Sequence, residues 1–428
     1  MLIIQNGIVL DKQSSEKQKV KDLWIDKGLI IEPLSQIPNE TQIIDAQDCW
    51  VLPGLVDIHS NLCDPGFNAK ESITSGSKAA IAGGYTKICC TPNTKPVADC
   101  VTILEYVKGK AKEESKIDIL PMACATKAMK GKEIVEMESL FKSGAVAFYD
   151  TQPYSDLKLF KIILQYAASI GAVVVSNPEN RELSLNGLMH QGEWAIKLGL
   201  DGIPEEAETS AIASQIEILR QVPRAKLHFA AISSVQSVEL IRRAKEDNLS
   251  VTSSVAPHHL LYTEASIGEY NTQLKVKPPL REEKDRLAII QGLLNGVIDC
   301  IASHHEPQNF ANKHLLFQDA AFGMVSLETC FSLFLEKICN SSLNKLCSLI
   351  DCFTAKPAQC LNIKATSLGF GQTADVIIVN PNLKWTYSKD SSYSQSFNSP
   401  LLNSTLKGKV IHNIKNGELI WSHSPQNG

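Results

Sequence analysis

The 428-residue sequence lacks the features that define several specialised classes of protein. It has no apolar run of the roughly 18 residues that a membrane-spanning helix needs, and its N-terminus lacks the charged and then apolar order of a signal peptide. It also lacks a sustained basic run, and 42 basic against 46 acidic residues give a formal net charge of -4. We therefore expect a cytoplasmic protein that binds neither a membrane nor nucleic acid.

Paired cysteines are missing as well. The 12 cysteines are spread along the chain, and none stands in the Cys-x-x-Cys spacing of zinc ribbons and dithiol redox sites. Several lie inside apolar stretches, as Cys89 and Cys90 do, which predicts buried, reduced thiols. Apolar residues make up 44% and charged residues 21% of the chain, and this is ordinary usage for a globular protein.

Short apolar, β-branched runs alternate with longer helical patterns between about residues 52 and 360. The eight runs are Leu55–Ile58, Tyr85–Thr91, Ile117–Ala125, Ala145–Tyr149, Ala172–Ser176, Lys226–Ile232, Leu249–Val255 and Val297–Ser303. Eight strands, each followed by room for a crossover helix within about 300 residues, predict an α/β fold of the (β/α)8 barrel type. Doubly wound sheets usually contain fewer strands.

The two ends of the chain have a different pattern. Residues 1–52 and 366–428 alternate apolar and polar side chains around turn signals, which is typical of short β-strands. Each end is too small to bury a core alone, so we expect both to pair into one β-sandwich domain, with a barrel of residues 53–365 inserted between them. Within that domain, residues 388–404 are rich in Ser and Asn and are predicted to form an exposed loop.

Chemistry in such a barrel takes place at the carboxyl ends of the strands. The first predicted strand and its continuation read Gly54-Leu55-Val56-Asp57-Ile58-His59-Ser60-Asn61. The segment resembles the amidohydrolase superfamily, whose first strand ends in His-x-His and binds a zinc pair. Further motifs narrow the resemblance to dihydroorotase of the long bacterial class: Asp64-Pro65-Gly66, Thr91-Pro92-Asn93-Thr94, Pro257-His258-His259-Leu260 and Pro278-Pro279-Leu280-Arg281. A hydantoinase or dihydropyrimidinase fits the second and third of these motifs less well.

The resemblance covers nearly the whole chain and implies a cyclic amidohydrolase of pyrimidine biosynthesis. In that family two divalent metals bridge a hydroxide that interconverts dihydroorotate and carbamoyl aspartate. The metals lower the pKa of the bound water, and a carboxylate moves the proton. Such a centre needs at least four or five histidine and carboxylate ligands, so each ligand position has to be checked in this chain.

Most of the implied metal ligands are replaced. His59 is retained, but Asn61 stands at the second histidine of the first strand. Asn177 and Ala231 stand at the histidines of the fifth and sixth strands. His304 stands at the position of the acid–base aspartate that follows the eighth strand. At the fourth strand the family shows Asp-Asp-Gly and this chain has Asp150-Thr151-Gln152, so Asp150 is a candidate ligand and the choice of aspartate stays open.

The positions that would contact the substrate are also altered. Cys63 replaces the arginine that would clamp the substrate carboxylate, and a thiol cannot supply a bidentate fork of donors. Lys277 replaces an asparagine, and Gln308 replaces a histidine that would face the substrate. Only Asn93 is retained. The resemblance therefore implies the fold of a dihydroorotase with a degenerate metal site.

Two functional hypotheses follow. In the first, the chain binds no zinc or binds it weakly, is catalytically impaired or inactive, and serves as a structural or regulatory partner of aspartate transcarbamoylase, as relatives in this family do. A homo-oligomer is also expected. In the second, the chain is an active cyclic amidohydrolase that uses a rearranged or one-metal site around His59, His304, His305 and Asp150. The sequence leaves open whether the chain is an enzyme.

Several motif residues have a structural interpretation that we prefer. His59 is expected to pack under the barrel mouth, and the imidazoles of His258 and His259 are expected to hydrogen-bond backbone at a strand-to-loop turn. Gly83-Gly84 predicts a tight helix-to-strand turn. A buried Glu179 should have a structural partner. The apolar stretch Phe317–Phe334 is expected to be largely a buried helix.

Overall fold

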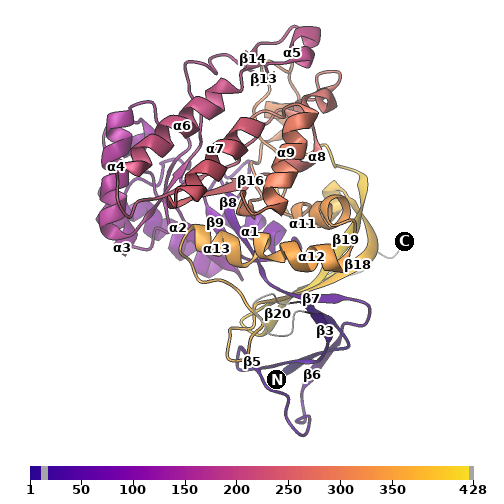
Figure 1. The fold of residues 1–428 in the computed structure, drawn as a ribbon. Helices are drawn as coiled ribbons and strands as arrows, with labels where there is room; N and C mark the ends of the chain where they lie inside the picture. The colour runs from indigo at the N-terminus through magenta and orange to yellow at the C-terminus, as the bar shows by residue number, and fades with distance from the viewer. Residues whose placement is uncertain (11–17, 424–428) are drawn as a thin grey trace.

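The computed structural model describes residues 1–10 and 18–423. Figure 1 shows one body in which helices surround a set of strands, and a second body in which strands from both ends of the chain lie together. None of the helices in the described part of the chain has the length and apolar character needed to cross a membrane.

Each barrel strand coincides with one of the eight predicted runs. The strands are β8 (Leu55–Ser60), β9 (Tyr85–Cys90), β10 (Asp118–Pro121), β11 (Phe148–Asp150), β12 (Val173–Ser176), β15 (Lys226–Phe229), β16 (Val251–Val255) and β17 (Cys300–Ile301). Only β8 and β11 extend beyond the predicted bounds, by two residues and one residue. The barrel strands form two parallel sheets, β8 to β10 and β11 to β17, each paired in chain order. Parallel bridges between Ala123 and Phe148 and between Ser60 and His305 join the sheets at both seams. Among the described residues, an isolated bridge, and no ladder, links the two sheets at each seam.

Helices cover the outside of these strands (Figure 1). The longer ones are α1 (Ile73–Ala82), α2 (Val101–Glu114), α4 (Leu157–Ile170), α6 (Glu206–Arg220), α7 (Val235–Glu246) and α9 (Glu283–Leu294). The shorter ones are α3 (Met137–Lys142), α5 (Glu193–Leu198), α8 (Pro257–Leu261), α10 (Phe310–Lys313), α11 (Cys330–Leu333), α12 (Leu343–Leu349) and α13 (Ala355–Cys360). Single turns occur at η1 (Lys127–Met129), η2 (Glu264–Ile267), η3 (Thr272–Leu274), η4 (Phe334–Ile338), η5 (Ile350–Phe353) and η6 (Lys389–Ser391). A small parallel pair, β13 (Met189–His190) and β14 (Gly202–Ile203), stands apart from the barrel sheets.

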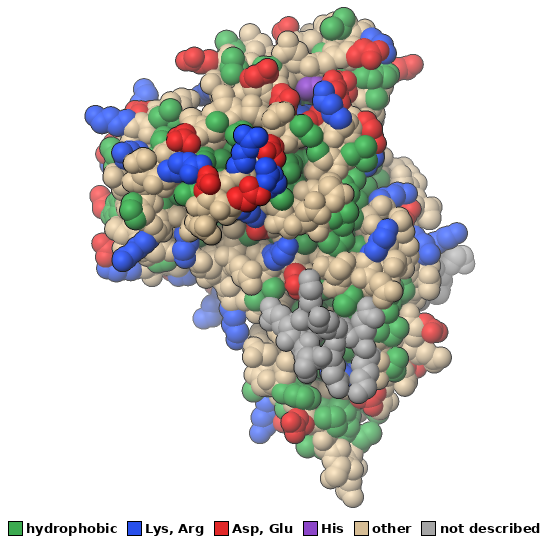
Figure 2. All heavy atoms as spheres, viewed as in Figure 1, with side chains coloured by type: hydrophobic (Ala, Val, Ile, Leu, Met, Phe, Trp, Pro, Cys, Tyr) green, Lys and Arg blue, Asp and Glu red, His purple; other side chains and the backbone are tan. Residues whose placement is uncertain are grey.

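Helix α4 illustrates why these segments become helical. The side chain of Asp156 accepts a hydrogen bond from the Leu159 amide and caps the first turn, and Gly171 ends the helix in the left-handed conformation at φ 75°. Between the caps, apolar residues at helical spacing, among them Phe160 and Ile163, are buried. On the face where α6 and α7 lie, Figure 2 shows basic and acidic side chains interspersed, so this face carries no field of one sign.

Strands from both termini share one core, as the alternating pattern predicts. The N-terminal strands are β1 (Leu2–Gln5), β2 (Ile8–Leu10), β3 (Gln18–Val20), β4 (Leu23–Asp26), β5 (Leu29–Ile31), β6 (Gln42–Asp45) and β7 (Trp50–Pro53). The C-terminal strands are β18 (Val376–Tyr387), β19 (Ser404–Lys415) and β20 (Glu418–Ser422). They form the sheets β5-β4-β1-β6 and β20-β19-β18-β7-β2-β3. Ile4, Val51, Ile378 and Ile414 pack in the shared core. The exact domain boundaries stay a prediction, namely 1–52 with 366–428 for the β-sandwich and 53–365 for the barrel.

The expectation of an exposed loop at residues 388–404 is confirmed only in part, because the segment is largely irregular but much of it is not exposed. Ser394, Ser396 and Asn398 are buried, and the segment lies against loops of the barrel. The Asn398 amide donates to the carbonyl oxygens of Glu306 and Gly323, both at 3.0 Å. Serine and asparagine predict exposure when composition alone is considered, but here their short polar side chains bond carbonyl and carboxylate groups, which offsets the cost of burial.

Two local expectations are confirmed, one of them in part. Gly84 has a φ of +95°, and a Cβ atom on Gly83 would lie 2.1 Å from the carbonyl oxygen of Leu327, so both glycines are needed at this helix-to-strand turn. The apolar stretch 317–334 is largely buried, with Phe331 and Phe334 packed on Phe353. Only residues 330–334, in α11 and at the start of η4, are helical. Residues 318–327 form turns and irregular chain.

A buried ion pair joins the terminal strands to the barrel. Lys415 Nζ lies 2.8 Å from Asp375 Oδ2 and 2.8 Å from Asp118 Oδ2, and Lys415 is 5% exposed. We expect Lys415→Ala to lower the free energy of unfolding by about 3 kcal/mol, because it leaves the buried Asp375 carboxylate without its cation. Urea denaturation measures the loss, and Lys384→Ala, on exposed β18 surface, is the control. Equal stability of the two variants would contradict the assigned role.

Candidate metal and substrate site at the barrel mouth

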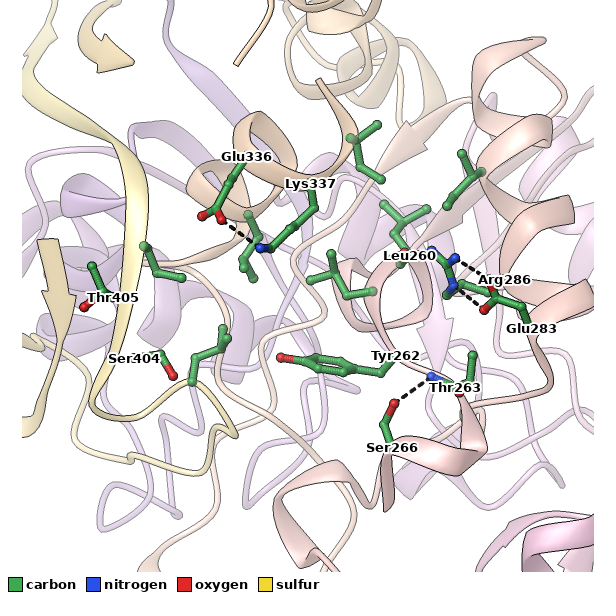
Figure 3. A pocket seen from close by; sticks show the side chains of 16 residues that line it. Leu260, Tyr262, Thr263, Ser266, Glu283, Arg286, Glu336, Lys337, Ser404 and Thr405 are labelled. Atoms are coloured by element: carbon green, nitrogen blue, oxygen red, sulfur yellow. Dashed lines mark hydrogen bonds and ion pairs between the residues drawn. The ribbon is translucent and has the colours of Figure 1, made fainter. Parts of the chain in front are cut away.

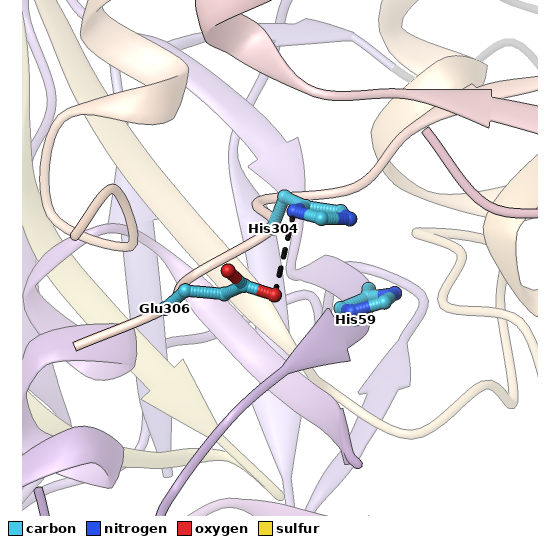
Figure 4. Close-up of side chains that lie close together, drawn as sticks. All are labelled: His59, His304 and Glu306. Carbon is cyan, nitrogen blue, oxygen red and sulfur yellow. Dashed lines mark ion pairs between the residues drawn. The ribbon is translucent and has the colours of Figure 1, made fainter. Parts of the chain in front are cut away.

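Two histidines and one glutamate come together at the carboxyl end of the barrel strands (Figure 4). His59 is the next-to-last residue of β8, and His304 and Glu306 lie in the segment that follows β17. One ligand atom from each lies within 4.8 Å of the others, and His304 Nδ1 is 4.0 Å from Glu306 Oε1. Within residues 1–10 and 18–423, no other group of three or more His, Cys, Asp and Glu side chains has this proximity.

The electrostatic environment keeps both imidazoles neutral. The rings of His59 and His304 are buried and stacked, with centroids 4.1 Å apart. Burial, helped by the nearby His228, lowers the pKa of His59 to about 3, and burial also lowers the pKa of His304 well below its ordinary value. Burial raises the pKa of the Glu306 carboxyl to about 7. Neutral imidazole nitrogen is the form that binds metal ions.

His305 does not join this cluster, although the sequence analysis grouped it with His59 and His304. Its Nδ1 accepts a hydrogen bond from the Ser326 amide, and its Nε2 lies 3.3 Å from Glu71 Oε2. Burial opposes ionisation of Glu71, but hydrogen bonds from His305, Ser394 and Ser75 hold the pKa of that carboxyl below its usual value. Glu71 also accepts from Ser394, so His305 belongs to the contact between the barrel and residues 388–403.

Asp150 also lies apart from the histidine and glutamate cluster. Its buried carboxylate accepts hydrogen bonds from the amides of Ala125 (2.9 Å) and Thr126 (3.2 Å) and from the Thr126 hydroxyl. Burial raises its pKa, although these hydrogen bonds act in the opposite direction. The carboxylate thus holds the loop that follows β10.

The remaining predicted ligand positions have local contacts. Asn61 Oδ1 accepts from the Cys63 amide at 3.0 Å, and Ala231 is buried with a φ of +51°. The Cys63 thiol is buried as well, which raises its pKa to about 12 and keeps it neutral. Asn177 lines a cleft of about 390 Å³ at the outer mouth together with Lys277.

Residues at the implied substrate positions bond to neighbours in the protein. Lys277 Nζ lies 2.7 Å from Glu179 Oε1, which gives Glu179 the structural partner that was expected. Gln308 donates from Nε2 to the carbonyl oxygen of Phe322 at 2.9 Å. Asn93 Oδ1 accepts from the Thr91 hydroxyl at 2.6 Å. These side chains therefore brace the mouth.

In the motif Pro257-His258-His259-Leu260, only His259 makes the backbone hydrogen bond that was expected of both histidines. His259 Nε2 lies 3.0 Å from the Pro278 carbonyl oxygen, as expected of a turn imidazole. His258 is buried, but neither of its ring nitrogens has a hydrogen-bond partner among the described residues. Its ring packs edge-on against His304, with centroids 6.1 Å apart. Unused hydrogen-bonding capacity therefore lies next to the cluster.

Glu306 was missed by the sequence analysis. The resemblance directed attention to the aspartate position, now His304, and not to a carboxylate two residues later. The available signal was the run His304-His305-Glu306 directly after a predicted barrel strand, where functional groups gather.

A second cleft, of about 630 Å³, lies away from the mouth between α8, α9, η4 and the start of β19 (Figure 3). Its charged side chains pair with each other: Glu283 with Arg286 at 2.5 Å and Glu336 with Lys337 at 2.7 Å. None of the sequence-predicted site residues lines it. It is therefore not the site that the family resemblance implies.

Comparisons with known proteins agree on fold and family. A family profile described as "Dihydro-orotase-like" matches residues 49–237. A dihydroorotase of Caldanaerobacter subterraneus subsp. tengcongensis is 39% identical, with 98% of this chain and 96% of the relative covered. A dihydroorotase of Aquifex aeolicus is 37% identical, with 98% and 99% covered. The structure of L-hydantoinase (dihydropyrimidinase) from Arthrobacter aurescens superposes with a TM-score of 0.86 at 21% identity, covering 98% and 96%. This structural match supports the barrel with its β-sandwich.

The hydrogen bonds of Asp150 predict a structural role. Asp150→Ala should lower the free energy of unfolding by about 3 kcal/mol, because it leaves buried donors of Ala125 and Thr126 without an acceptor. Asp150→Asn, which keeps one carbonyl oxygen, should cost less. Chemical denaturation and elemental analysis of the same samples test this. A variant that lost bound metal and kept its stability would show instead that Asp150 is a ligand.

Proposed function

The chain belongs to the dihydroorotase family, and we propose that it is a member whose two-metal centre has degenerated and that it acts in pyrimidine biosynthesis as a structural or regulatory protein. The observation that carries the proposal is the bonding at the barrel mouth. Several polar side chains at the positions where the family binds metal and substrate are bonded to the protein itself, namely those of Asn61, Asp150, Asn93, Lys277 and Gln308.

The donor set does not fit two metal ions. His59, His304 and Glu306 supply three ligand atoms, whereas two ions that share a hydroxide need more, and neighbouring positions offer little. Asn61 has its amide oxygen engaged by Cys63, and Ala231 has no donor atom in its side chain. We therefore expect no zinc, or weakly bound zinc at well under one ion per chain, in the purified protein.

The substrate positions support the same proposal. A cyclic amide with a carboxylate would be held by a bidentate arginine, but the buried neutral thiol of Cys63 stands there. Lys277 brings a cation to the mouth, yet Glu179 already neutralises it. Residues 388–403 add a further layer, because Ser394 and Asn398 tie this segment to Glu71 and to the Glu306 backbone.

A protein with this fold and no catalytic activity can still function by binding a partner protein. Both the helical exterior and the mouth are large enough for a specific interface, which buries more than about 1,000 Å². The partner that family resemblance suggests is aspartate transcarbamoylase. In this proposal the chain forms a homo-oligomer and binds that partner in the cytoplasm. Binding to the folded partner would stabilise its assembly by mass action.

An active one-metal hydrolase is the alternative function, and the cluster at His59 favours it. Two imidazoles and a carboxylate are a donor set that also occurs in catalytic zinc sites with an open position. Full metal occupancy at purification, together with amide hydrolysis that is lost on chelation, would support the alternative.

The proposal predicts no turnover. Hydrolysis or formation of dihydroorotate should equal the buffer background with and without added zinc, because both the two-metal centre and the carboxylate clamp are replaced. The assay follows dihydroorotate at high enzyme concentration, with His59→Ala and with His314→Ala, an exposed histidine, as the matched control. Turnover that survives His314→Ala and disappears in His59→Ala would contradict the proposal.

The partner is tested by sedimentation velocity. This chain and aspartate transcarbamoylase of the same cell, mixed at micromolar concentration, should sediment as one larger species, and the transcarbamoylase should unfold at a higher temperature in the mixture. Independent sedimentation across this range, with unchanged transcarbamoylase activity and thermal stability, would remove the partner hypothesis.

A further inference from the structure

We infer that His59, His304 and Glu306 form a site for a single late first-row divalent cation of the zinc class, in which two of the three ligands are not those of the family pattern. His304 stands where that pattern has an aspartate, and Glu306 follows two residues later. The inference shares one premise with the proposed function, which is that the two-metal centre has been lost.

The backbone fixes the two halves of this site beside each other. Ser60, next to His59, forms a parallel bridge with His305, next to His304. The amide of Asn61 donates to the carbonyl oxygen of His305 at 2.9 Å. The ligands on β8 and after β17 therefore come from segments that are hydrogen-bonded to each other, and no loop has to close to bring them together.

The side chains need only a small adjustment. Zinc binds nitrogen at about 2.0–2.1 Å, which places tetrahedral ligand atoms roughly 3.3 Å apart. The three ligand atoms now lie within 4.8 Å of one another, and the imidazole rings are stacked at an interplanar angle of 23°. Rotation of the rings about their side-chain bonds would turn one nitrogen of each toward a common centre. Glu306, at 29% side-chain exposure, leaves a side open to solvent.

The chemistry of the donors selects the class of cation. Two imidazole nitrogens and one carboxylate suit zinc, cobalt or nickel, whereas magnesium and calcium prefer oxygen ligands. The Glu306 carboxylate makes no side-chain hydrogen bond within the described residues, and its ion-pair contact is His304. A carboxylate in this setting is costly to ionise without a partner, and a bound cation would supply one. The unpaired nitrogens of His258 beside His304 leave room for polar contacts around the ion.

The test uses the full chain after dialysis against a chelator. Cobalt(II), which reports its coordination through visible absorption, is titrated into the protein, and zinc is then added to displace it. We expect saturation at one equivalent, with low-symmetry absorption that zinc abolishes. Thermal unfolding followed with and without zinc should show a higher midpoint with the cation, because the ion joins β8 to the segment after β17.

Variants decide which residues hold the ion. His304→Ala and the conservative Glu306→Gln should each weaken cobalt binding by at least about 10-fold, the scale on which even outer contacts of metal sites act. The controls His314→Ala and Glu269→Gln remove exposed groups of the same types and should bind as the parent does. Circular dichroism establishes that each variant is folded.

The outcomes separate this inference from the proposed function. No saturable binding, or one equivalent that is insensitive to both His304→Ala and Glu306→Gln, overturns the inference and leaves the proposed loss of the two-metal centre standing. Two tightly bound equivalents overturn the proposed function instead. One equivalent that both variants weaken, with no turnover of dihydroorotate, supports both.

Discussion

The seam between β8 and β17 is the constraint on which the site depends. The buried Asp57 carboxylate on β8 accepts hydrogen bonds from the Ser303 amide (2.6 Å) and the Ser303 hydroxyl (2.7 Å), and also from Ser60. Burial raises the pKa of Asp57, and these hydrogen bonds oppose that rise. Because this carboxylate ties β8 to the segment that follows β17, it holds the backbone of His59 and of His304 side by side.

A polar residue at a buried mouth needs hydrogen-bond partners. Here Asn61 bonds Cys63, Lys277 pairs with Glu179, and His305 bonds Ser326 and Glu71. Residues 388–403 complete this network from the terminal strands. The mouth is therefore stabilised by hydrogen bonds and ion pairs between its own polar side chains. A hydrogen-bond network whose members are satisfied makes the mouth rigid, which favours a fixed surface over an open active site.

The barrel strands were predictable because fully buried parallel strands have continuous apolar runs, as in Ala172–Ser176 and β12. The pairing of the two termini followed from their small size. Residues 388–404 were misjudged because their burial depends on acceptors such as Glu71, more than 300 positions away, which local composition does not encode. Likewise, the positions of the His305 imidazole and the Glu306 carboxylate depend on the path of the segment after β17. Sequence spacing alone could not tell which of them turns toward His59.

The central claim is that the mouth has one inherited imidazole and no two-metal centre. Diffraction from crystals grown with excess zinc, recorded on both sides of the zinc absorption edge, tests it most directly by locating each bound ion. The account predicts at most one anomalous peak at the mouth, between His59, His304 and Glu306. Two peaks a few ångströms apart, with Asn61 or Asn177 among the ligands, would contradict it.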